Sequence, residues 1–362
     1  MRVLYFGTYE RDYPRNAQVI SCLRGAGVEV VETNVPLWDG ARHKLSPGLR
    51  TLGRAVQAEI RLARSSGGNA DVILVGYPGH IDMPAAKRVA GKHPVVFNPL
   101  VSLEDTMIGD RALASSSSLR ARALRRLDRL AFRSADLVVA DTAAHAEYFE
   151  ERFGLSSERT AVCYVGAEDR IFSAGERSEG PFNVLFVGKL IPLHGLETIL
   201  AAAEICQEIE FRVVGSGQLD ALLDRLPRNV HWEHWVDYER LPDLYREAGC
   251  ALGVFGLSEK AARVIPNKAF QALATGTPLI TADTPAAREL LTDHQDALLV
   301  APGSPRALAT AIRALAAEPT LRRHLSERGR QTYSEHASES VLGARWRSIL
   351  DHALETRTAP GG

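Results

Sequence analysis

The sequence predicts an α/β protein with two doubly wound domains that face a central cleft. Three observations point to this fold class: short apolar strands alternate with helix-length segments, polar or glycine-containing loops follow many of these strands, and one stretch near the middle has the composition of a linker. A length of 362 residues is also long for a single hydrophobic core. We therefore expect the active site in a cleft between two sheets.

Composition and cysteine spacing argue against several kinds of site and binding partner. The 43 Lys and Arg residues balance 44 Asp and Glu residues, so the overall charge gives no reason to expect nucleic-acid binding. The four cysteines are far apart and form no CxxC pair, which argues against a zinc knuckle and against a disulfide framework. The apolar start is too short for a signal peptide, and no stretch reaches transmembrane length. We expect a cytoplasmic protein, at most peripheral to the inner face of the membrane.

The first domain, expected at residues 1–172, opens with a βαβ unit. An apolar strand is followed by a helix that Gly27 closes and by a second strand, which is typical of a doubly wound sheet. The same alternation continues through the domain. Strands are expected at residues 2–9, 28–34, 71–77, 94–100, 135–141 and 160–165, and helices at residues 15–26, 49–64, 119–133 and 143–153.

Loops that follow three of these strands carry candidate site residues, because open α/β sheets bind ligands at the carboxyl ends of their strands. Gly7 permits a ligand to approach the backbone closely, and Arg11 follows in the same loop. His80 is a candidate general base or acceptor-positioning group, although a histidine after a glycine is also a common turn residue. Asp105 lies in a polar cluster after a later strand. The first loop lacks a G-x-G-x-x-G pattern, which argues against a nicotinamide or flavin cofactor.

The helix expected at Leu119–Arg133 is basic and amphipathic. Its arginines are opposed by the single acid Asp128, and leucines and alanines recur on one side. Two interpretations remain open. The arginine face is solvated, or it contacts an anionic membrane surface or a phosphorylated acceptor.

The second domain, expected at residues 182–340 after a linker at 173–181, repeats the alternation without a visible sequence repeat. Strands are expected at residues 183–187, 210–214, 230–235, 251–255 and 278–281, and helices at residues 196–208, 218–225, 241–248, 267–275 and 304–317. A last helix is expected at residues 338–354, and we expect the C-terminal segment 341–362, which contains most of this helix, to pack back on the first domain.

The helix that starts at Pro266 has the features of an anion site. Pro266 fixes the backbone angle, and Asn267 offers a side-chain oxygen to the first free N–H groups. Asn267, Lys268 and Gln271 share one face, and Arg263 lies just upstream. Since the helix dipole disfavours a cation in the first turn by roughly 0.3 to 1 kcal/mol, a bound diphosphate would relieve the conflict. A solvated lysine beside a good cap is the alternative.

Two glycine-containing loops of the second domain carry further candidates. Lys189 and His194 lie in one loop and can contact phosphate oxygens, with Lys268 approaching from the helix. Gly215 and Gly217 permit backbone approach to a base or ribose, although a tight turn alone also explains both glycines.

These residues resemble the GT-B retaining glycosyltransferases of family 4 along nearly the whole chain, most strongly at residues 182–334. Val187-Gly-Lys-Leu-Ile-Pro-Leu-His-Gly195 is similar to the family's VGR-L-x-P-x-KG loop, and Val214-Gly-Ser-Gly-Gln218 is similar to its VGdGp turn. Gln271-Ala-Leu-Ala-Thr-Gly-Thr-Pro278 resembles its EAmAxGxPV segment, and Tyr164-Val-Gly-Ala-Glu-Asp169 resembles its NGvD element. The resemblance implies the GT-B fold, with two Rossmann-like domains.

The resemblance also implies that a sugar passes from a nucleotide-sugar to an acceptor hydroxyl, with retention at the anomeric carbon and without a metal ion. Lys189 and His194 correspond to the family's basic pair for the donor diphosphate, and Arg263 and Gln271 correspond to its two glutamates in the E-x7-E pattern. The chain departs from the family at these four positions. Pro266-Asn-Lys-Ala-Phe-Gln271 resembles a variant of the helix that some members carry.

Candidate roles follow from this resemblance. The catalytic candidates are Lys189, Lys268 and His80, the donor-binding candidates are Gly7, His194, Gly215, Gly217, Arg263, Asn267 and Gln271, and the acceptor-side candidates are Arg11 and Asp105. The expected donor is a UDP-, GDP- or dTDP-sugar, and no further cofactor is expected. The expected acceptor is a saccharide, a lipid-linked molecule or a small molecule.

Two other classes of function remain open. A nucleotide-sugar epimerase or hydrolase would use the same fold but needs a base, for which His80, Asp105 and Asp110 are the candidates. A non-catalytic binding protein is compatible with the absence of the paired glutamates.

Overall fold

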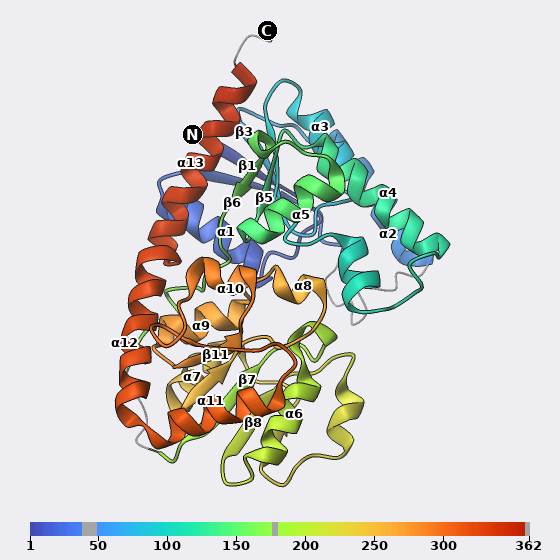
Figure 1. The fold of residues 1–362 in the computed structure, drawn as a ribbon. Helices are drawn as coiled ribbons and strands as arrows, with labels where there is room; N and C mark the ends of the chain where they lie inside the picture. The colour runs from blue at the N-terminus through green and yellow to red at the C-terminus, as the bar shows by residue number, and fades with distance from the viewer. Residues whose placement is uncertain (38–48, 176–179, 359–362) are drawn as a thin grey trace. The chain divides into compact units, whose positions relative to one another are not determined.

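The computed structural model describes residues 1–37, 49–175 and 180–358, except for the side chains of residues 49–52 and 358. The chain forms two compact units (Figure 1). Unit 1 comprises Met1–Tyr164 and Glu339–Gly362, and unit 2 comprises Val165–Ser338. Residues 176–179 of the expected linker lie outside the described residues, and the rest of that segment belongs to unit 2.

Unit 1 contains a parallel sheet of six strands in the order β2-β1-β3-β4-β5-β6. The chain starts inside the sheet and winds outward in both directions, as in a doubly wound fold, which confirms the predicted fold class. The strands are β1 (Arg2–Gly7), β2 (Glu29–Asn34), β3 (Val72–Val75), β4 (Val95–Phe97), β5 (Leu137–Ala140) and β6 (Thr160–Val162). The helices are α1 (Pro14–Gly25), α2 (Leu49–Arg64), α3 (Met83–Ala90), α4 (Leu119–Ser134), α5 (Ala143–Phe153) and α13 (Glu339–Thr358), with a π-helical turn η1 (Asp105–Asp110) and a 3-10 turn η2 (Ser157–Arg159).

Alternate residues of β1 divide the core of unit 1 into two layers. Leu4 and Phe6 join a cluster that includes Phe132 and other residues of α2 to α5. Val3 and Tyr5 join a second cluster with residues of α1 and α13. Because successive side chains of a strand point to opposite faces of the sheet, one short apolar strand contributes to both layers.

The last helix, α13, belongs to unit 1 and packs along α1 (Figure 1). Gly343 permits this close packing, because a Cβ there would lie 2.5 Å from the carbonyl oxygen of Cys22. Arg345 donates a hydrogen bond to the carbonyl oxygen of Val162 over 2.9 Å, and the side chain of Trp346 is buried. The end of the chain therefore completes the core of its first half.

Unit 2 contains a second parallel sheet of six strands, in the order β12-β11-β10-β7-β8-β9. The strands are β7 (Asn183–Val187), β8 (Glu210–Val214), β9 (Val230–Glu233), β10 (Cys250–Leu252), β11 (Leu279–Ala282) and β12 (Leu298–Val300). The α-helices are α6 (Leu196–Ile205), α7 (Leu241–Glu247), α8 (Glu259–Ala262), α9 (Asn267–Thr275), α10 (Pro285–Leu290), α11 (Pro305–Ala317) and α12 (Pro319–His336). The 3-10 turns are η3 (Pro192–His194), η4 (Asp220–Asp224) and η5 (Tyr238–Arg240).

Helices cover both faces of this second sheet. Phe186 of β7 and Val213 of β8 pack in one cluster with Ile199 of α6 and Ile312 of α11. Helix α9 packs against α7 and α12 and also contacts β10 and β11. The second half of the predicted fold is therefore confirmed as well.

Some elements differ from the sequence-based expectation. The helices α3, α8, α10 and α12 and the strand β12 were not predicted. Helix α12 buries few of its side chains, so its apolar pattern is too sparse to reveal a helix. The helix expected at 218–225 was wrong, because the structure has the 3-10 turn η4 there. The Asp220 carboxylate accepts the N–H of Gly217 over 2.6 Å, and such a local bond favours a turn over a helix.

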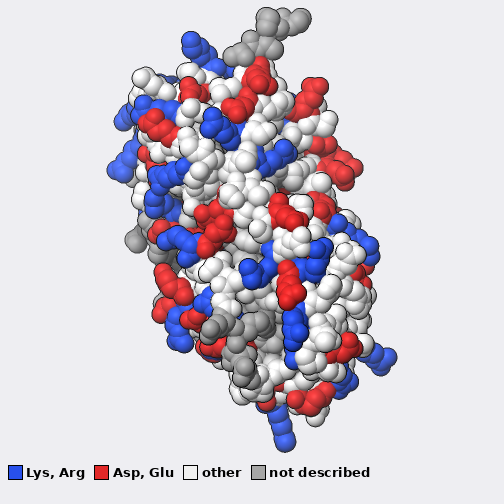
Figure 2. Space-filling model, turned by 90° about the vertical axis from the view of Figure 1, so that its left-hand side faces the viewer, with Lys and Arg blue, Asp and Glu red and all other residues white. Residues whose placement is uncertain are grey.

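The surface carries no dominant charge on the face that Figure 2 shows, where basic and acidic side chains are interspersed. None of the helices in the described ranges combines the length and the apolar character that a membrane span requires.

Candidate functional site

The candidate anion site of unit 2 lies where β7 ends and α9 begins. Gly188 directly follows β7 with a φ of 154°, a conformation that L side chains rarely adopt. A Cβ at this position would lie 2.7 Å from Nζ of Lys268 and 3.3 Å from Cε1 of His194. The structure thus brings together two of the predicted cations around a glycine whose missing side chain leaves them room.

Lys268 has an unusual environment for a lysine. The residue is 5% exposed, and within the described part of the chain its Nζ atom has no hydrogen-bond partner. Nζ lies over the ring of Phe186, 4.3 Å from the ring centroid. Burial lowers the pKa of the Lys268 ammonium well below its usual value. The face of an aromatic ring offsets part of this desolvation, and a bound anion would supply the missing hydrogen bonds.

His194 and Lys189 lie in the same loop but contribute differently. The Nδ1 atom of His194 hydrogen-bonds the carbonyl oxygen of Lys189. Since a carbonyl can only accept, the proton is on Nδ1, and Nε2 becomes a donor only when the ring is protonated. The His194 side chain is largely buried, whereas Lys189 is exposed.

The glycines of the next loop serve packing within the chain. Gly215 has a φ of 130°, and a Cβ there would overlap the carbonyl oxygen of Gly188. A Cβ on Gly217 would lie 2.6 Å from the carbonyl oxygen of Leu190. The carbonyl of Gly215 also accepts the indole N–H of Trp232 over 2.8 Å. Both glycines therefore let the loops at the carboxyl ends of β7 and β8 pack against each other.

The start of α9 differs from the expected cap. Pro266 is the N-cap and Asn267 the first helical residue, and no side chain caps the helix, so the prediction that Asn267 caps it was wrong. The predicted stop was correct, because Gly276 adopts the left-handed conformation at the C-cap. Free N–H groups at the start of a helix attract anions, so the missing cap keeps this end available to a ligand.

Arg263 and Gln271, the two positions compared above with the E-x7-E pattern, lie in different surroundings. Gln271 is buried, and its Oε1 atom accepts the hydroxyl of Tyr245 over 3.1 Å. Arg263 forms an ion pair of 3.5 Å with the exposed Glu259. Gln271 thus belongs to a buried polar network that ties α9 to α7.

In unit 1, Gly7 makes room for a carboxylate of the protein itself. Its φ is 136°, and a Cβ there would lie 2.5 Å from Oδ2 of Asp82. The buried Asp82 accepts the backbone N–H of Thr8 over 2.8 Å and its hydroxyl over 3.0 Å. Burial and the neighbouring Asp82 raise the pKa of Glu59 to about 8. The protonated carboxyl group of Glu59 is then a donor toward Asp82, whereas two carboxylates would have no donor between them.

Arg11 lies beside a surface cavity of about 490 Å³, which residues 10–14, 34 and 36 line. Its guanidinium donates to both oxygens of Glu32, with the shortest distance at 3.0 Å. Glu32 also accepts from Arg24 and from the hydroxyl of Tyr9. Arg11 is therefore held at the rim of this cavity by a paired carboxylate.

His80 lies inside the core of unit 1 rather than at its surface. The residue is 2% exposed, and its ring packs edge-on against Phe97 and Phe132. Its Nε2 atom is 3.4 Å from Oδ1 of Asp128, which is fully buried. Burial lowers the pKa of His80, so the neutral ring is favoured.

Asp105 is the first residue of η1, and it is largely buried. Its backbone N–H donates to the hydroxyl of Ser102 over 3.1 Å. A Cβ on Gly109 would lie 3.2 Å from Oδ1 of Asp105, so the carboxylate lies over this glycine.

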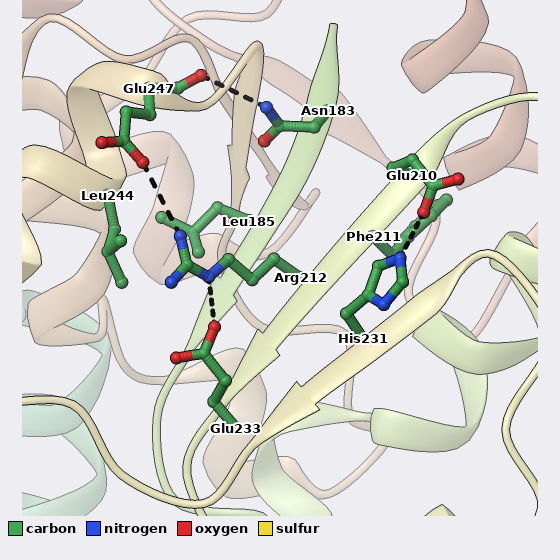
Figure 3. Close-up of a pocket in the computed structure, with 9 residues that line it drawn as sticks. All are labelled: Asn183, Leu185, Glu210, Phe211, Arg212, His231, Glu233, Leu244 and Glu247. Atoms are coloured by element: carbon green, nitrogen blue, oxygen red, sulfur yellow. Dashed lines mark hydrogen bonds and ion pairs between the residues drawn. The ribbon is translucent and has the colours of Figure 1, made fainter. Parts of the chain in front are cut away.

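Figure 3 shows a separate cavity of about 340 Å³ on β7, β8, β9 and α7. Arg212 extends between Glu233 at 2.6 Å and Glu247 at 3.6 Å. His231 pairs with Glu210 at 2.7 Å. Both basic side chains of this cavity are already paired, so it lacks the available cation that a phosphate ligand needs.

Several residues that shape these sites were not identified from the sequence. Phe186 lies inside a strand and carries no signal other than hydrophobicity, whereas Asp82 lies two residues after His80, in the same predicted strand-end loop. Asp128 offered the clearest signal, because it is the single acid of a helix rich in arginine. In the described residues, no group of three or more His, Cys, Asp or Glu side chains is placed to hold a metal ion.

Comparison with known families identifies similarity in both units. Residues 181–318 match the model of the family described as Glycosyl transferases group 1, and residues 2–166 match the model described as Glycosyl transferase 4-like domain. The lipopolysaccharide core biosynthesis glycosyltransferase LpsE of Rhizobium meliloti is 24% identical over 60% of this chain and 65% of its own length. A D-inositol 3-phosphate glycosyltransferase of Catenulispora acidiphila is 30% identical over 61% and 57%. The aligned region thus spans half to about two thirds of these relatives.

Solved structures with the GT-B fold match almost the entire chain. The sucrose-phosphate synthase of Thermosynechococcus elongatus has a TM-score of 0.75 at 18% identity, covering 98% of this chain and 99% of that one. HepE of Anabaena, solved in complex with UDP-glucose, has a TM-score of 0.69 at 17% identity, covering 97% and 99%. At these identities the likeness concerns the fold alone.

Proposed function

The chain belongs to the group 1 glycosyltransferases of family 4, which have the GT-B fold, and we propose that it transfers a sugar from a nucleotide-sugar to an acceptor hydroxyl. Transfer proceeds with retention at the anomeric carbon and without a metal ion. The observation that carries the proposal is the buried Nζ atom of Lys268, which lacks a hydrogen-bond partner among the described residues and faces the gap left by Gly188.

The chemical task of this site is to stabilise a departing nucleoside diphosphate. Negative charge develops on the diphosphate as the bond to the sugar breaks, and a cation fixed in a desolvated site stabilises that charge more strongly than one in water. Lys268 supplies this cation, the start of α9 supplies free N–H groups, and Lys189 and protonated His194 complete the site. Gln271, Asn267 and Arg263 contact the nucleotide.

The donor is a nucleotide-sugar, and a UDP-sugar is the first candidate. HepE was solved with UDP-glucose, and the LpsE relative is a glycosyltransferase of lipopolysaccharide core biosynthesis. GDP- and dTDP-sugars are the alternatives for this chain. On the acceptor side, Asp105 and Arg11 orient a hydroxyl of a saccharide, a lipid-linked molecule or a small molecule.

The substitution Lys268→Met tests the anion site. Methionine fills a similar volume but removes the ammonium, so the variant should fold and should be at least as thermally stable without ligand. We expect its affinity for UDP, measured by calorimetry, to fall by about tenfold or more. Lys92→Met, which removes an exposed lysine of unit 1, is the control and should leave the affinity unchanged.

Two results would count against the proposal. If UDP-, GDP- and dTDP-sugars all fail to raise the melting temperature of the unmodified protein, there is no donor site. If Lys268→Met binds the nucleotide within about twofold of the unmodified protein, the diphosphate lies elsewhere.

We also propose that α4 contacts an anionic membrane surface. Leu119 and Leu130 are 77% and 61% exposed, and Arg122, Arg126 and Arg129 are exposed on the same helix. Basic and apolar side chains together favour binding to anionic lipid headgroups. Replacing these three arginines with glutamine should abolish sedimentation with phosphatidylglycerol vesicles. The same change at Arg306, Arg323 and Arg330 of unit 2, also exposed, should not. Equal loss in both variants, or equal binding to neutral vesicles, would contradict the proposal.

A further inference from the structure

Asp128 is the single acidic residue of the arginine-rich helix α4, yet it makes no ion pair with the arginines. Its carboxylate is fully buried and receives hydrogen bonds from three consecutive residues of the segment before η1. Oδ2 accepts the hydroxyl of Ser102 over 2.7 Å and the N–H of Glu104 over 2.9 Å, and Oδ1 accepts the N–H of Leu103 over 3.0 Å. This is the arrangement of a side chain that caps a turn from outside.

Ser102 passes this constraint on to Asp105. Its hydroxyl can donate only one hydrogen, and the bond to Asp128 uses it, so the oxygen lone pairs face the other way. One of them accepts the N–H of Asp105 over 3.1 Å. The carbonyl oxygen of Ser102 also accepts the N–H and the hydroxyl of Thr106 over 3.0 and 2.7 Å. Two hydrogen bonds thus connect Asp128 to the backbone of Asp105.

The surroundings hold this arrangement on both sides. His80 approaches Oδ1 of Asp128 from the aromatic core, at 3.4 Å. The carboxylate of Glu104 lies 3.6 Å from Arg125 and 3.2 Å from Arg152, which belong to α4 and α5. The segment before η1 is therefore fixed to two helices of unit 1.

We propose that Asp128 is a positioning residue for the acceptor side of the reaction, acting through Ser102 to hold Asp105 in place. The inference rests on the proposed function, because it takes Asp105 as the carboxylate that orients the acceptor hydroxyl. His80 contributes from the core by packing against Asp128 and does not touch the substrate. Asp128 is thus not a surface acid that balances the arginines of α4.

A double-mutant cycle tests this proposal in the full-length protein. The donor is whichever of UDP-glucose, GDP-mannose and dTDP-glucose raises the melting temperature most. Water takes the place of the acceptor hydroxyl that Asp105 orients, and release of the nucleoside diphosphate is measured. Asp105→Asn and Asp128→Asn should each lower the rate by about tenfold, with nucleotide affinity changed by less than about twofold. Because Asp128 acts through Asp105, the double variant should be no slower than Asp105→Asn alone.

The control is Asp136→Asn, which also removes a carboxylate of unit 1 that accepts a backbone N–H, from Val95 over 2.7 Å. It should leave the rate unchanged. Hydrogen–deuterium exchange should be faster at residues 102–106 in Asp128→Asn and in Ser102→Ala, but not in Asp136→Asn. Ser102→Ala is the second variant should Asp128→Asn fail to fold.

The outcomes separate the inference from the proposed function. If the unmodified protein neither binds nor cleaves any of the three donors, the proposed function fails. The inference about an acceptor side then fails with it, even if hydrogen–deuterium exchange shows that Asp128 holds residues 102–106 in place. The inference about Asp128 alone is overturned if the unmodified protein cleaves the donor but Asp128→Asn cleaves it at the same rate. It is also overturned if the rate losses of the two single variants multiply in the double variant.

Discussion

At the scale of single residues, each unit contains buried charged or titratable groups that lower the stability of the unliganded protein. A buried ammonium without a hydrogen-bond partner, as in Lys268 among the described residues, is costly in the free protein. Two neighbouring carboxyl groups, Glu59 and Asp82, are costly for the same reason unless they share a proton. Such costs persist where a ligand or a mechanism makes use of them, so they indicate function more clearly than hydrophobic packing does.

The pair of Glu59 and Asp82 predicts a dependence of stability on pH. The pKa of Glu59 is raised to about 8 in the folded protein, mainly by burial, so the protonated pair stabilises the fold fully below the unfolded value near 4.5. This contribution is lost as the pH rises through about 8. Glu59→Gln keeps a donor toward Asp82 at every pH.

The measurement compares thermal unfolding of the two proteins from pH 5 to pH 9. As the pH rises from 5 to about 8, the unmodified protein should lose on the order of 1 kcal/mol of stability relative to Glu59→Gln, once partial exposure of Glu59 is taken into account, and the difference should change little above that pH. Parallel curves would show that the carboxyl groups do not share a proton. Glu59→Ala, which lacks a donor, should be less stable than Glu59→Gln throughout this range.

Adding even a methyl group at Gly215 should strongly destabilise the folded protein. Gly215→Ala places a methyl group against the carbonyl oxygen of Gly188, at a φ that alanine rarely adopts. We expect a loss of more than about 2 kcal/mol in the free energy of unfolding, measured by urea denaturation. Gly25→Ala is the matched control, because no atom lies within 4 Å of the added Cβ at the end of α1. It should be neutral or stabilising by about 0.4 to 1 kcal/mol. Similar losses in both variants would refute the steric argument.

At the scale of elements, the sequence revealed strands and helices with strong apolar patterns and missed those without one. The strands β7 and β8 match their predicted ranges because each is a compact apolar run bounded by loop residues. Helix α12 was missed because it lies on the surface and buries few side chains. The short helix α3 was missed because Pro84 near its start resembles a loop signal.

The site was predictable to the extent that it is local in sequence. The position of Lys268 near the start of α9 follows from Pro266 and the helical pattern. That its Nζ atom lies over Phe186 and beside Gly188 depends on how α9 packs on the sheet of unit 2, which no local pattern encodes. The burial of His80 was missed for the same reason, because Phe132 is far away in the sequence.

The C-terminal helix α13 contributes a large buried side chain to the core of unit 1. Trp346 is buried among residues of α1 and the sheet, and the guanidinium of Arg15 lies 5.7 Å from its ring. Trp346→Ala should therefore destabilise the protein by about 3 to 5 kcal/mol in urea denaturation, through the cavity it leaves. Ser348→Ala changes an exposed position of the same helix and should shift stability by less than about 0.5 kcal/mol. A loss below about 1 kcal/mol for Trp346→Ala would mean that α13 is not part of the core.

At the scale of the whole molecule, the chain passes from unit 1 to unit 2 after Tyr164 and returns after Ser338. Unit 2 is thus one continuous segment, whereas unit 1 is assembled from the two ends of the chain. The main hydrophobic cluster of unit 2 lies wholly within residues 184–325. The cluster around α1, in contrast, combines Tyr5 with Trp346 and Leu350 from the other end of the sequence.

This difference predicts that the two units behave unequally when they are separated. Residues 165–338 expressed alone should fold cooperatively and should bind UDP with an affinity close to that of the full chain, because Lys268, His194 and α9 all belong to this segment. Residues 1–164 alone should be unstable, because they expose the surface that Trp346 covers. Joining residues 339–362 to them through a flexible linker should restore folding, as judged by near-ultraviolet circular dichroism and urea denaturation. A stable 1–164 fragment would show that α13 is dispensable. A folded 165–338 fragment that does not bind UDP would show that donor binding requires residues of unit 1.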